Sequence, residues 1–343
     1  HIGMRHLSLL CLLAAAHAPP ASAFHASLAR LPLSTSSPSS FSSLSTPLSP
    51  IATRKHAPAT RPSAPSMNLA ISLPAVSAAV ASIAPAMAPL PYAAVAILPS
   101  CLGLYKSDYG VSYGYGLGMI LPGLLTLPHC VTPIAKLHAL LYIAYGVRLN
   151  LFLLYREMNI TSMRAIKEKI EERVKARGGR LQRLPFIAMC GFLYFAMAAP
   201  LHLTATARAL PPAAVGFLAL GWLGFAAAAI GDAQKTLAKV GQPNKLVRSG
   251  LYSVCRHPNF TGEAFLWTSS ALVGILTAIA TGTLTAVLGW VALSAVGASG
   301  MSYVLCKAAS GLESRQRDKY GDEPGYEEWI ESTWAGVTLP PSK

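Results

Sequence analysis

The longest stretch of this chain without a charged residue constrains its fold most strongly. Residues 264–306 are 43 positions without Asp, Glu, Lys or Arg. One helix needs about 20 apolar residues to cross a bilayer, so this stretch predicts two membrane-spanning helices that turn near Gly282. The composition agrees: 52% of the residues are hydrophobic and 12% are charged, whereas soluble domains are about 25% charged.

Further apolar runs predict an all-α, polytopic membrane protein with about 6–7 transmembrane helices. The runs before the uncharged stretch are 91–105, 111–131, 134–155, 184–203 and 212–230. The first two form one or two spans, and the weaker run at 68–87 is either a span or processed sequence. The glycines between Gly110 and Gly118 have no strand pattern around them, so close helix packing is a better interpretation than a nucleotide-binding loop.

Three polar segments, 156–183, 232–263 and 307–343, interrupt the apolar runs. Two spans separate each segment from the next, so all three emerge on the same face of the membrane. The positive-inside rule places this face in the stroma or cytosol. Basic loops explain the net charge of +14, and no basic helix face or aromatic motif indicates nucleic-acid binding.

The first 66 residues are typical of targeting sequence. Residues 1–23 contain a basic start, an apolar core and an Ala-Ser-Ala site, which together predict a signal peptide. Residues 24–66 hold sixteen Ser or Thr and no acid, as in a transit peptide, with a disordered linker as the alternative. This order resembles the presequence of algae with secondary plastids. We expect a plastid membrane, with the endoplasmic reticulum as the alternative, N-terminal spans at 67–133 and a membrane domain at 134–343.

The second polar segment carries the candidate site. Asp232 and Glu263 are the only acids between Glu172 and Glu313, and each lies where an apolar run meets this segment. Ionisable residues at this depth are costly and indicate function, although snorkelling at the interface is the alternative. Asp and Asn can hold ribose hydroxyls or a carboxamide, and basic side chains can neutralise phosphates. The basic candidates are Lys239, Lys245, Arg248 and Arg256.

The segment Arg256-His257-Pro258-Asn259-Phe260-x-Gly262-Glu263 resembles a family signature. It is similar to the Arg-His-Pro-Asn-Tyr-x-Gly-Glu signature of the DUF1295 proteins, which are related to steroid 5α-reductases and sterol C14/Δ7 reductases. Upstream Gly-Asp and a tail rich in Tyr and Trp extend the resemblance over residues 134–340. Phe260 stands where the family more often has Tyr.

The resemblance implies an NADPH-dependent reduction of a carbon–carbon double bond in a lipid-like substrate, such as a sterol, an isoprenoid or another enone. It implies that Asp232, Asn259 and Glu263 contact the cofactor. It also implies that Lys239 and Lys245 lie near the cofactor's phosphates and that Trp267 lies near the cofactor. Arg256 and His257 are motif residues counted with the cofactor site. The proton donor of steroid reductases is a Tyr with an acid in the N-terminal half, which does not align here. The catalytic residue therefore stays unassigned; the residues available there are Tyr105, Tyr109, Tyr113, Tyr115, Tyr142, Tyr145 and Asp108.

A membrane methyltransferase of the isoprenylcysteine or phospholipid type, using S-adenosylmethionine, is the alternative because its motif is similar. Those enzymes usually have an apolar residue at the position of Glu263 and lack the upstream Gly-Asp, which favours the reductase. A non-enzymatic scaffold is a further alternative. The six cysteines form no CxxC pair, so we expect no metal site. The sequence predicts neither the substrate's identity nor the oligomeric state.

Overall fold

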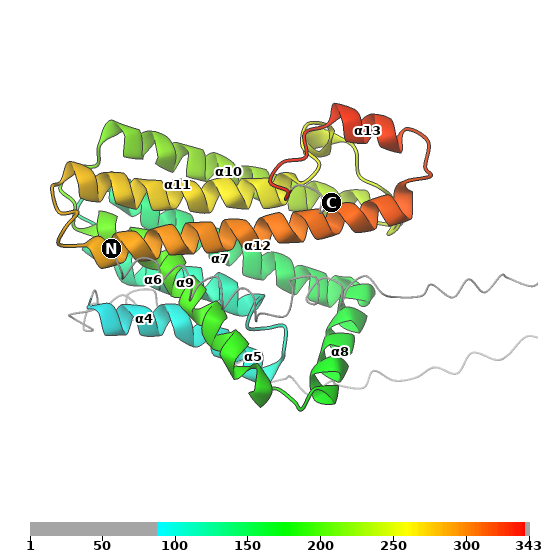
Figure 1. Cartoon of the computed structure of the whole chain (residues 1–343), viewed down its shortest axis with the longest axis horizontal. Coiled ribbons are helices and arrows are strands. Elements are labelled where there is room, and N and C mark those ends of the chain that lie inside the picture. The colour runs from blue at the N-terminus through cyan, green and yellow to red at the C-terminus, as the bar shows by residue number, and fades with distance from the viewer. Residues whose placement is uncertain (1–87, 340–343) are drawn as a thin grey trace, which may run out of the picture. The chain divides into compact units, whose positions relative to one another are not determined.

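The computed structural model describes residues 88–339, without the side chains of residues 161 and 162 (Figure 1). Within this range every regular element is a helix, and one isolated bridge pairs Cys255 with Trp334. The predicted signal peptide, transit segment and run at 68–87 lie outside the described residues. The elements, with 3-10 helices written η, are α4 (Pro89–Ile97), η1 (Leu98–Cys101), α5 (Leu102–Tyr105), α6 (Tyr113–Thr126), η2 (Leu127–His129), α7 (Pro133–Asn159), α8 (Thr161–Ala176), η3 (Leu181–Arg183), α9 (Leu184–Ala205), α10 (Pro212–Ala238), η4 (Gly250–Ser253), α11 (Pro258–Ala280), α12 (Leu288–Tyr320) and α13 (Tyr326–Ser332).

Five helices in the described part of the chain are long and apolar enough to cross a membrane. They are α7, α9 with η3, α10, α11 and α12, and they confirm the all-α polytopic membrane fold. The runs predicted at 91–105 and 111–131 form shorter helices. A 3-10 turn containing Pro99 interrupts Pro89–Tyr105, and α6 has 14 residues.

The long uncharged stretch divides as predicted. Helix α11 ends at Ala280, Gly282 has a φ of +68°, and α12 begins at Leu288. Glycine reaches this left-handed conformation without a steric penalty, so the chain can reverse here and return as a second span.

Close helix contacts depend on glycine in two places. Helix α10 packs along α11, and α6 packs along α7. A Cβ atom at Gly262 would overlap the carbonyl oxygen of Gly224, and one at Gly146 would overlap that of Gly116. The predicted use of the glycines at 110–118 for close packing is therefore confirmed.

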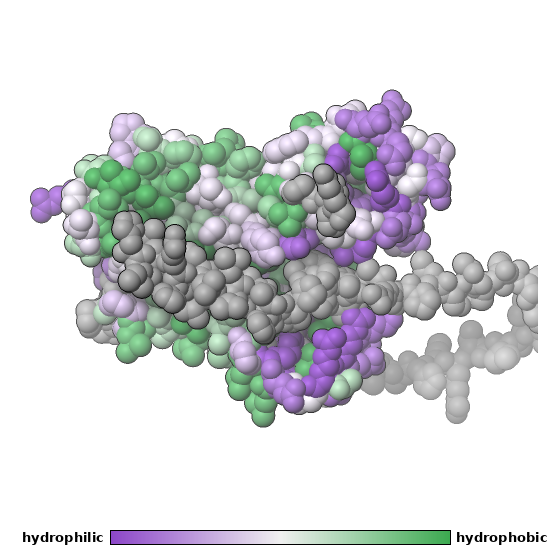
Figure 2. Space-filling view, viewed as in Figure 1, coloured by the Kyte–Doolittle hydropathy of each residue, from purple (hydrophilic) through white to green (hydrophobic). Residues whose placement is uncertain are grey.

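Charged residues gather at one end of the bundle. Helix α8, the loop after α10 and α13 lie at this end, on the right in Figure 1, and hydrophilic residues cover it in Figure 2. The turn between α11 and α12 lies at the opposite end (Figure 1). The C-terminal segment folds back over the loop after α10, and Leu246, Tyr320, Tyr326 and Trp329 form a buried cluster there. The three polar segments thus share one face, as the sequence predicts.

Candidate ligand site between helices α6, α7, α10 and α11

Three residues of the predicted site meet where α10 and α11 run side by side. Asp232 lies near the polar end of α10, and Asn259 and Glu263 lie on the first two turns of α11. The Asn259 amide donates to Asp232 Oδ1 over 3.1 Å. The family motif therefore brings an amide and a carboxylate together from two helices, and all three side chains stay partly accessible.

Arg148 of α7 completes this polar group. Its Nη2 donates to Asp232 Oδ2 over 2.6 Å and to the Ala228 carbonyl over 3.0 Å. Its Nη1 is buried and has no partner among the described residues. Sequence reasoning did not assign Arg148 to the site, although a cation inside an apolar run was the signal that could have found it.

Aromatic rings from four helices, α6, α7, α9 and α11, lie deeper in the bundle than Arg148. The ring centroids of Tyr145 (α7) and Trp267 (α11) are 4.8 Å apart, and Tyr115 (α6) lies 5.5 Å from Tyr145 and 6.3 Å from Trp267. Tyr142 packs edge-on against Trp267 at 5.2 Å, and Tyr194 stacks on Tyr115 at 5.4 Å. These rings form an apolar lining that carries polar atoms at its edges.

Three polar atoms of this aromatic group are unpaired, whereas the Tyr142 and Tyr194 hydroxyls donate to backbone carbonyls. The Tyr115 and Tyr145 hydroxyls and Trp267 Nε1 are buried and have no hydrogen-bond partner in the described part of the chain. The Glu263 carboxylate lies close enough to the Tyr115 and Tyr145 hydroxyls to interact with them electrostatically, although neither hydroxyl meets the distance and angle limits of a hydrogen bond to it. A buried unpaired donor costs about 1–3 kcal/mol. Three such donors beside one carboxyl group indicate that a bound ligand or water molecule accepts hydrogen bonds from them.

Cations gather on the polar side of Asp232. Lys235 interacts electrostatically with Lys239, Asp232, Arg156 and Arg315. Neither Lys235 nor Arg315 forms an ion pair with any residue in the range 88–339. Lys235 thus has three cationic neighbours and one acidic neighbour, and that acid, Asp232, is already paired with Arg148. The cluster therefore has positive charge available for an anionic group such as phosphate.

The predicted phosphate residues Lys239 and Lys245 lie on the loop after α10. Lys239 Nζ donates to the Pro243 carbonyl over 3.2 Å, and burial together with the nearby Lys319 lowers the pKa of its ammonium group. Lys245 and Arg248 line an open cleft of about 770 Å³. This loop lies beyond Asp232, toward the polar face.

The sequence profile of the DUF1295 family, described as proteins of unknown function, matches residues 111–333. The chain belongs to the DUF1295 family. No curated protein and no solved structure matches it significantly. The matched range includes Tyr115, Arg148, Asp232, Glu263 and Arg315, so the site described above lies within the family's domain.

Two motif residues of this DUF1295 protein face the C-terminal segment. Arg256 Nε donates to Glu313 over 2.6 Å, and its Nη1 donates to the carbonyls of Ile330 and Thr333 over 2.6 and 2.7 Å. His257 is 1% exposed, and burial lowers the pKa of its imidazole despite a Glu313 oxygen 3.8 Å away. The Arg256 side chain is thus committed to the C-terminal segment, whereas His257 Nε2 is buried without a hydrogen-bond partner among the described residues. The role of both residues in cofactor binding stays a prediction.

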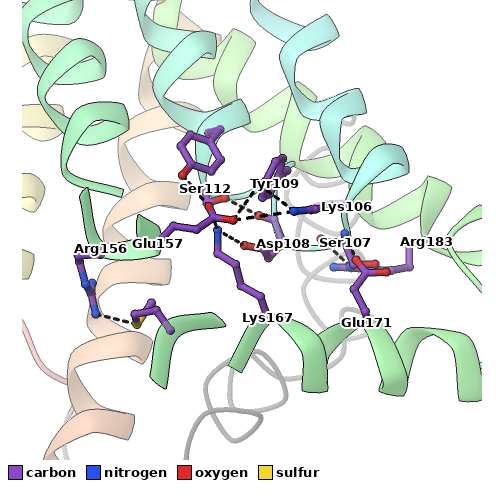
Figure 3. Close-up of polar contacts among 12 residues, drawn as sticks. Lys106, Ser107, Asp108, Tyr109, Ser112, Arg156, Glu157, Lys167, Glu171 and Arg183 are labelled. Atoms are coloured by element: carbon purple, nitrogen blue, oxygen red, sulfur yellow. Dashed lines mark hydrogen bonds and ion pairs between the residues drawn. The ribbon is translucent and has the colours of Figure 1, made fainter. Parts of the chain in front are cut away.

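A second polar cluster joins α7 and α8 to the loop before α6 (Figure 3). Lys167 Nζ lies 2.5 Å from Glu157 and 3.2 Å from Asp108, and the Tyr109 and Tyr113 hydroxyls donate to Glu157 over 3.0 and 2.7 Å. Burial raises the pKa of the Asp108 carboxyl, and Lys167 opposes that shift. Asp108, Glu157 and Lys167 of this DUF1295 protein each have a partner of opposite charge, so the cluster anchors α8. The Tyr109 and Tyr113 hydroxyls are both used in hydrogen bonds to Glu157.

Proposed function

We propose that this DUF1295 protein is a membrane oxidoreductase that uses NADPH to reduce a carbon–carbon double bond next to a carbonyl group in a lipid-like substrate. The observation that carries the proposal is the group of unpaired donors on Tyr115, Tyr145 and Trp267 beside Glu263. The resemblance of the motif at 256–263 to membrane reductases supports the same chemistry.

The residues near the polar end fit this cofactor. Asp232 and Asn259 suit ribose hydroxyls or a carboxamide, and Arg148 Nη1 and Asn150 Oδ1 are further buried polar atoms without a partner in the described chain. The cation cluster around Lys235 suits phosphate groups. The cluster lies on the face from which a soluble, charged cofactor would arrive.

The aromatic end suits the reacting part of the substrate. When bound, NADPH supplies the hydride that adds to the β-carbon of the conjugated system. Tyr115, Tyr145 and Trp267 can donate hydrogen bonds to the carbonyl oxygen, on which negative charge develops during the reduction. Glu263, one helical turn before Trp267, can provide the proton for the α-carbon, directly or through a tyrosine hydroxyl.

A methyltransferase that uses S-adenosylmethionine is the second candidate, and one observation favours it. Aromatic rings beside a carboxylate attract a sulfonium cation, and Tyr145, Trp267 and Glu263 form such a group. S-adenosylmethionine carries no phosphate, however, so it would leave the cations around Lys235 without a partner. A sulfonium also offers no acceptor to three hydrogen-bond donors.

Thermal unfolding of the purified full-length protein in detergent distinguishes the two cofactors. A ligand at 100 times its Kd stabilises the fold by about 2.7 kcal/mol, so NADPH should raise the Tm and S-adenosylmethionine should not. Lys235→Met should weaken the NADPH shift. Lys136→Met is the matched control and should retain the NADPH shift, because Lys136 is an exposed cation in the first turn of α7, at the end opposite Arg148 and the candidate site. A shift with S-adenosylmethionine alone would contradict the proposal.

The substrate class is tested in cells. Loss of the gene should cause accumulation of a lipid that is two hydrogens lighter than the normal product. An unchanged ratio of unsaturated to reduced lipids, together with altered methylation of a lipid or protein, would support the methyltransferase instead.

A further inference from the structure

His138 is a fully buried imidazole in the membrane-spanning helix α7. Its Nδ1 lies 3.0 Å from Thr204 Oγ1 on α9, and its Nε2 lies 2.8 Å from Ser270 Oγ on α11. Polar groups at this depth have no bulk water to satisfy them. One side chain therefore joins three helices through hydrogen bonds.

The network continues from Ser270 to Tyr142. Ser270 Oγ lies 2.6 Å from the Tyr142 hydroxyl, which donates to the Met197 carbonyl over 2.7 Å. If Nε2 carries the proton of a neutral imidazole, His138 donates to Ser270 and Ser270 donates to Tyr142. Thr204 then donates its single hydroxyl hydrogen to Nδ1 over 3.0 Å in place of the Pro200 and Leu201 carbonyls, which lie 3.3 and 3.2 Å away. Every group then has a partner, and a satisfied buried network holds its members in one arrangement.

One member of this network, Tyr142, packs directly against Trp267 of the candidate site. The Tyr142 ring packs edge-on against the indole at 5.2 Å, and Tyr145, one turn further along α7, packs edge-on at 4.8 Å. Ser270 lies one turn after Trp267 on α11. The network therefore fixes Tyr142, whose ring packs against the indole, and Ser270, one turn from Trp267 on the same helix, while the indole Nε1 itself stays unpaired.

We propose that His138 is a positioning residue for the site. It holds Ser270 and, through Ser270, the Tyr142 hydroxyl; the Tyr142 ring packs against the Trp267 ring, whose orientation sets the direction of the unpaired Nε1–H. The consequence for reaction rests on the proposed function, in which Trp267 donates to the substrate's carbonyl oxygen.

Fluorine NMR of the full-length protein labelled with 5-fluorotryptophan tests this positioning. The chain has five tryptophans, and the Trp267 signal is identified by its loss in Trp267→Phe. His138→Leu and Ser270→Ala should each shift or broaden this signal, and His138→Gln, whose amide can reach Ser270, should restore it. Thr277→Ala is the matched control, since the buried Thr277 hydroxyl on the same helix bonds to the Val273 carbonyl over 2.7 Å; this variant should leave the signal unchanged.

An unchanged Trp267 signal in Ser270→Ala would overturn the inference, even if His138→Leu failed to fold. The spectra need no cofactor. A wild-type protein that binds no NADPH would therefore refute the proposed function and leave the positioning to be decided by the same signals. If NADPH does bind, its addition should move the Trp267 signal of the wild type.

Discussion

Replacing Arg256 by Lys keeps the positive charge but removes the planar guanidinium that holds the C-terminal segment. In the wild type this group, whose side chain is 11% exposed, bonds to Glu313 and to the carbonyls of Ile330 and Thr333. A lysine ammonium at this position can keep one of these three hydrogen-bonded partners and loses the other two. The C-terminal segment is closed when it is bonded to Arg256 and open when it has detached. Two lost hydrogen bonds at about 1.5 kcal/mol each destabilise the closed form by about 3 kcal/mol. This raises the population of the open form roughly 150-fold.

Limited trypsin digestion without added ligand measures this opening. The initial rate of cleavage after Arg317 and Lys319 should follow the open population, so Arg256→Lys should increase it by roughly two orders of magnitude. Arg248→Lys is the matched control. Arg248 donates one exposed bond of 3.2 Å to Pro324 of the same segment, and its loss should change the rate by less than roughly threefold. Equal rates for the two variants would refute the reasoning and favour a direct ligand role for Arg256.

Two further predictions concern the fold. Gly262→Ala should lower the free energy of unfolding by about 1–3 kcal/mol because the new methyl group meets Gly224. Gly289→Ala, whose methyl group meets open space in α12, should not lower the Tm in the same thermal scan, since alanine is the better helix former; an equal loss in both variants would contradict this. Burial opposes ionisation of Glu171, but hydrogen bonds from the Ser107 amide and an arginine outweigh it, so the pKa of this carboxyl lies below its usual range. Its contribution to stability is therefore present above the ordinary pKa of about 4.5 and is lost as the pH falls further. The Tm difference between wild type and Glu171→Gln should accordingly shrink at acid pH, and a constant difference would contradict the assignment.

The sequence predicted those parts of the fold that depend on local composition. The uncharged stretch at 264–306 predicted two spans and a turn at Gly282, because length and polarity alone decide whether a helix can cross a bilayer. The same reasoning overestimated the lengths of the first two helices. Pro99 lies in a 3-10 turn between α4 and α5, and its effect depends on the neighbouring backbone.

The candidate site was only partly predictable because its pairs come from distant segments. Asp232, Asn259 and Glu263 were identified from the motif and from the scarcity of acids. The partner of Asp232 is Arg148, 84 positions earlier in the chain, and helix packing decides that pairing. Tyr115 and Tyr145 could not be separated from the other tyrosines for the same reason.

Arg256 illustrates the opposite case. Its motif and charge indicated a phosphate ligand, whereas its guanidinium bonds to backbone carbonyls 74 and 77 positions later. Every residue has a backbone carbonyl, so residue types do not indicate which carbonyls Arg256 would bond to, and no sequence pattern could have predicted this arrangement. Local chemistry identifies candidates, and the tertiary fold decides which atoms remain free for a ligand.

Transfer of deuterium from NADPH to a lipid tests the central claim most directly. The purified full-length protein is incubated with lipid extract from cells that lack the gene and with NADPH deuterated at C4 on the transferred face. The wild type should produce a reduced lipid carrying one deuterium at carbon, whereas Glu263→Gln, which lacks the proposed proton donor, should produce little labelled lipid even at saturating NADPH. Absence of deuterated product, together with label transferred from methyl-deuterated S-adenosylmethionine, would contradict the account.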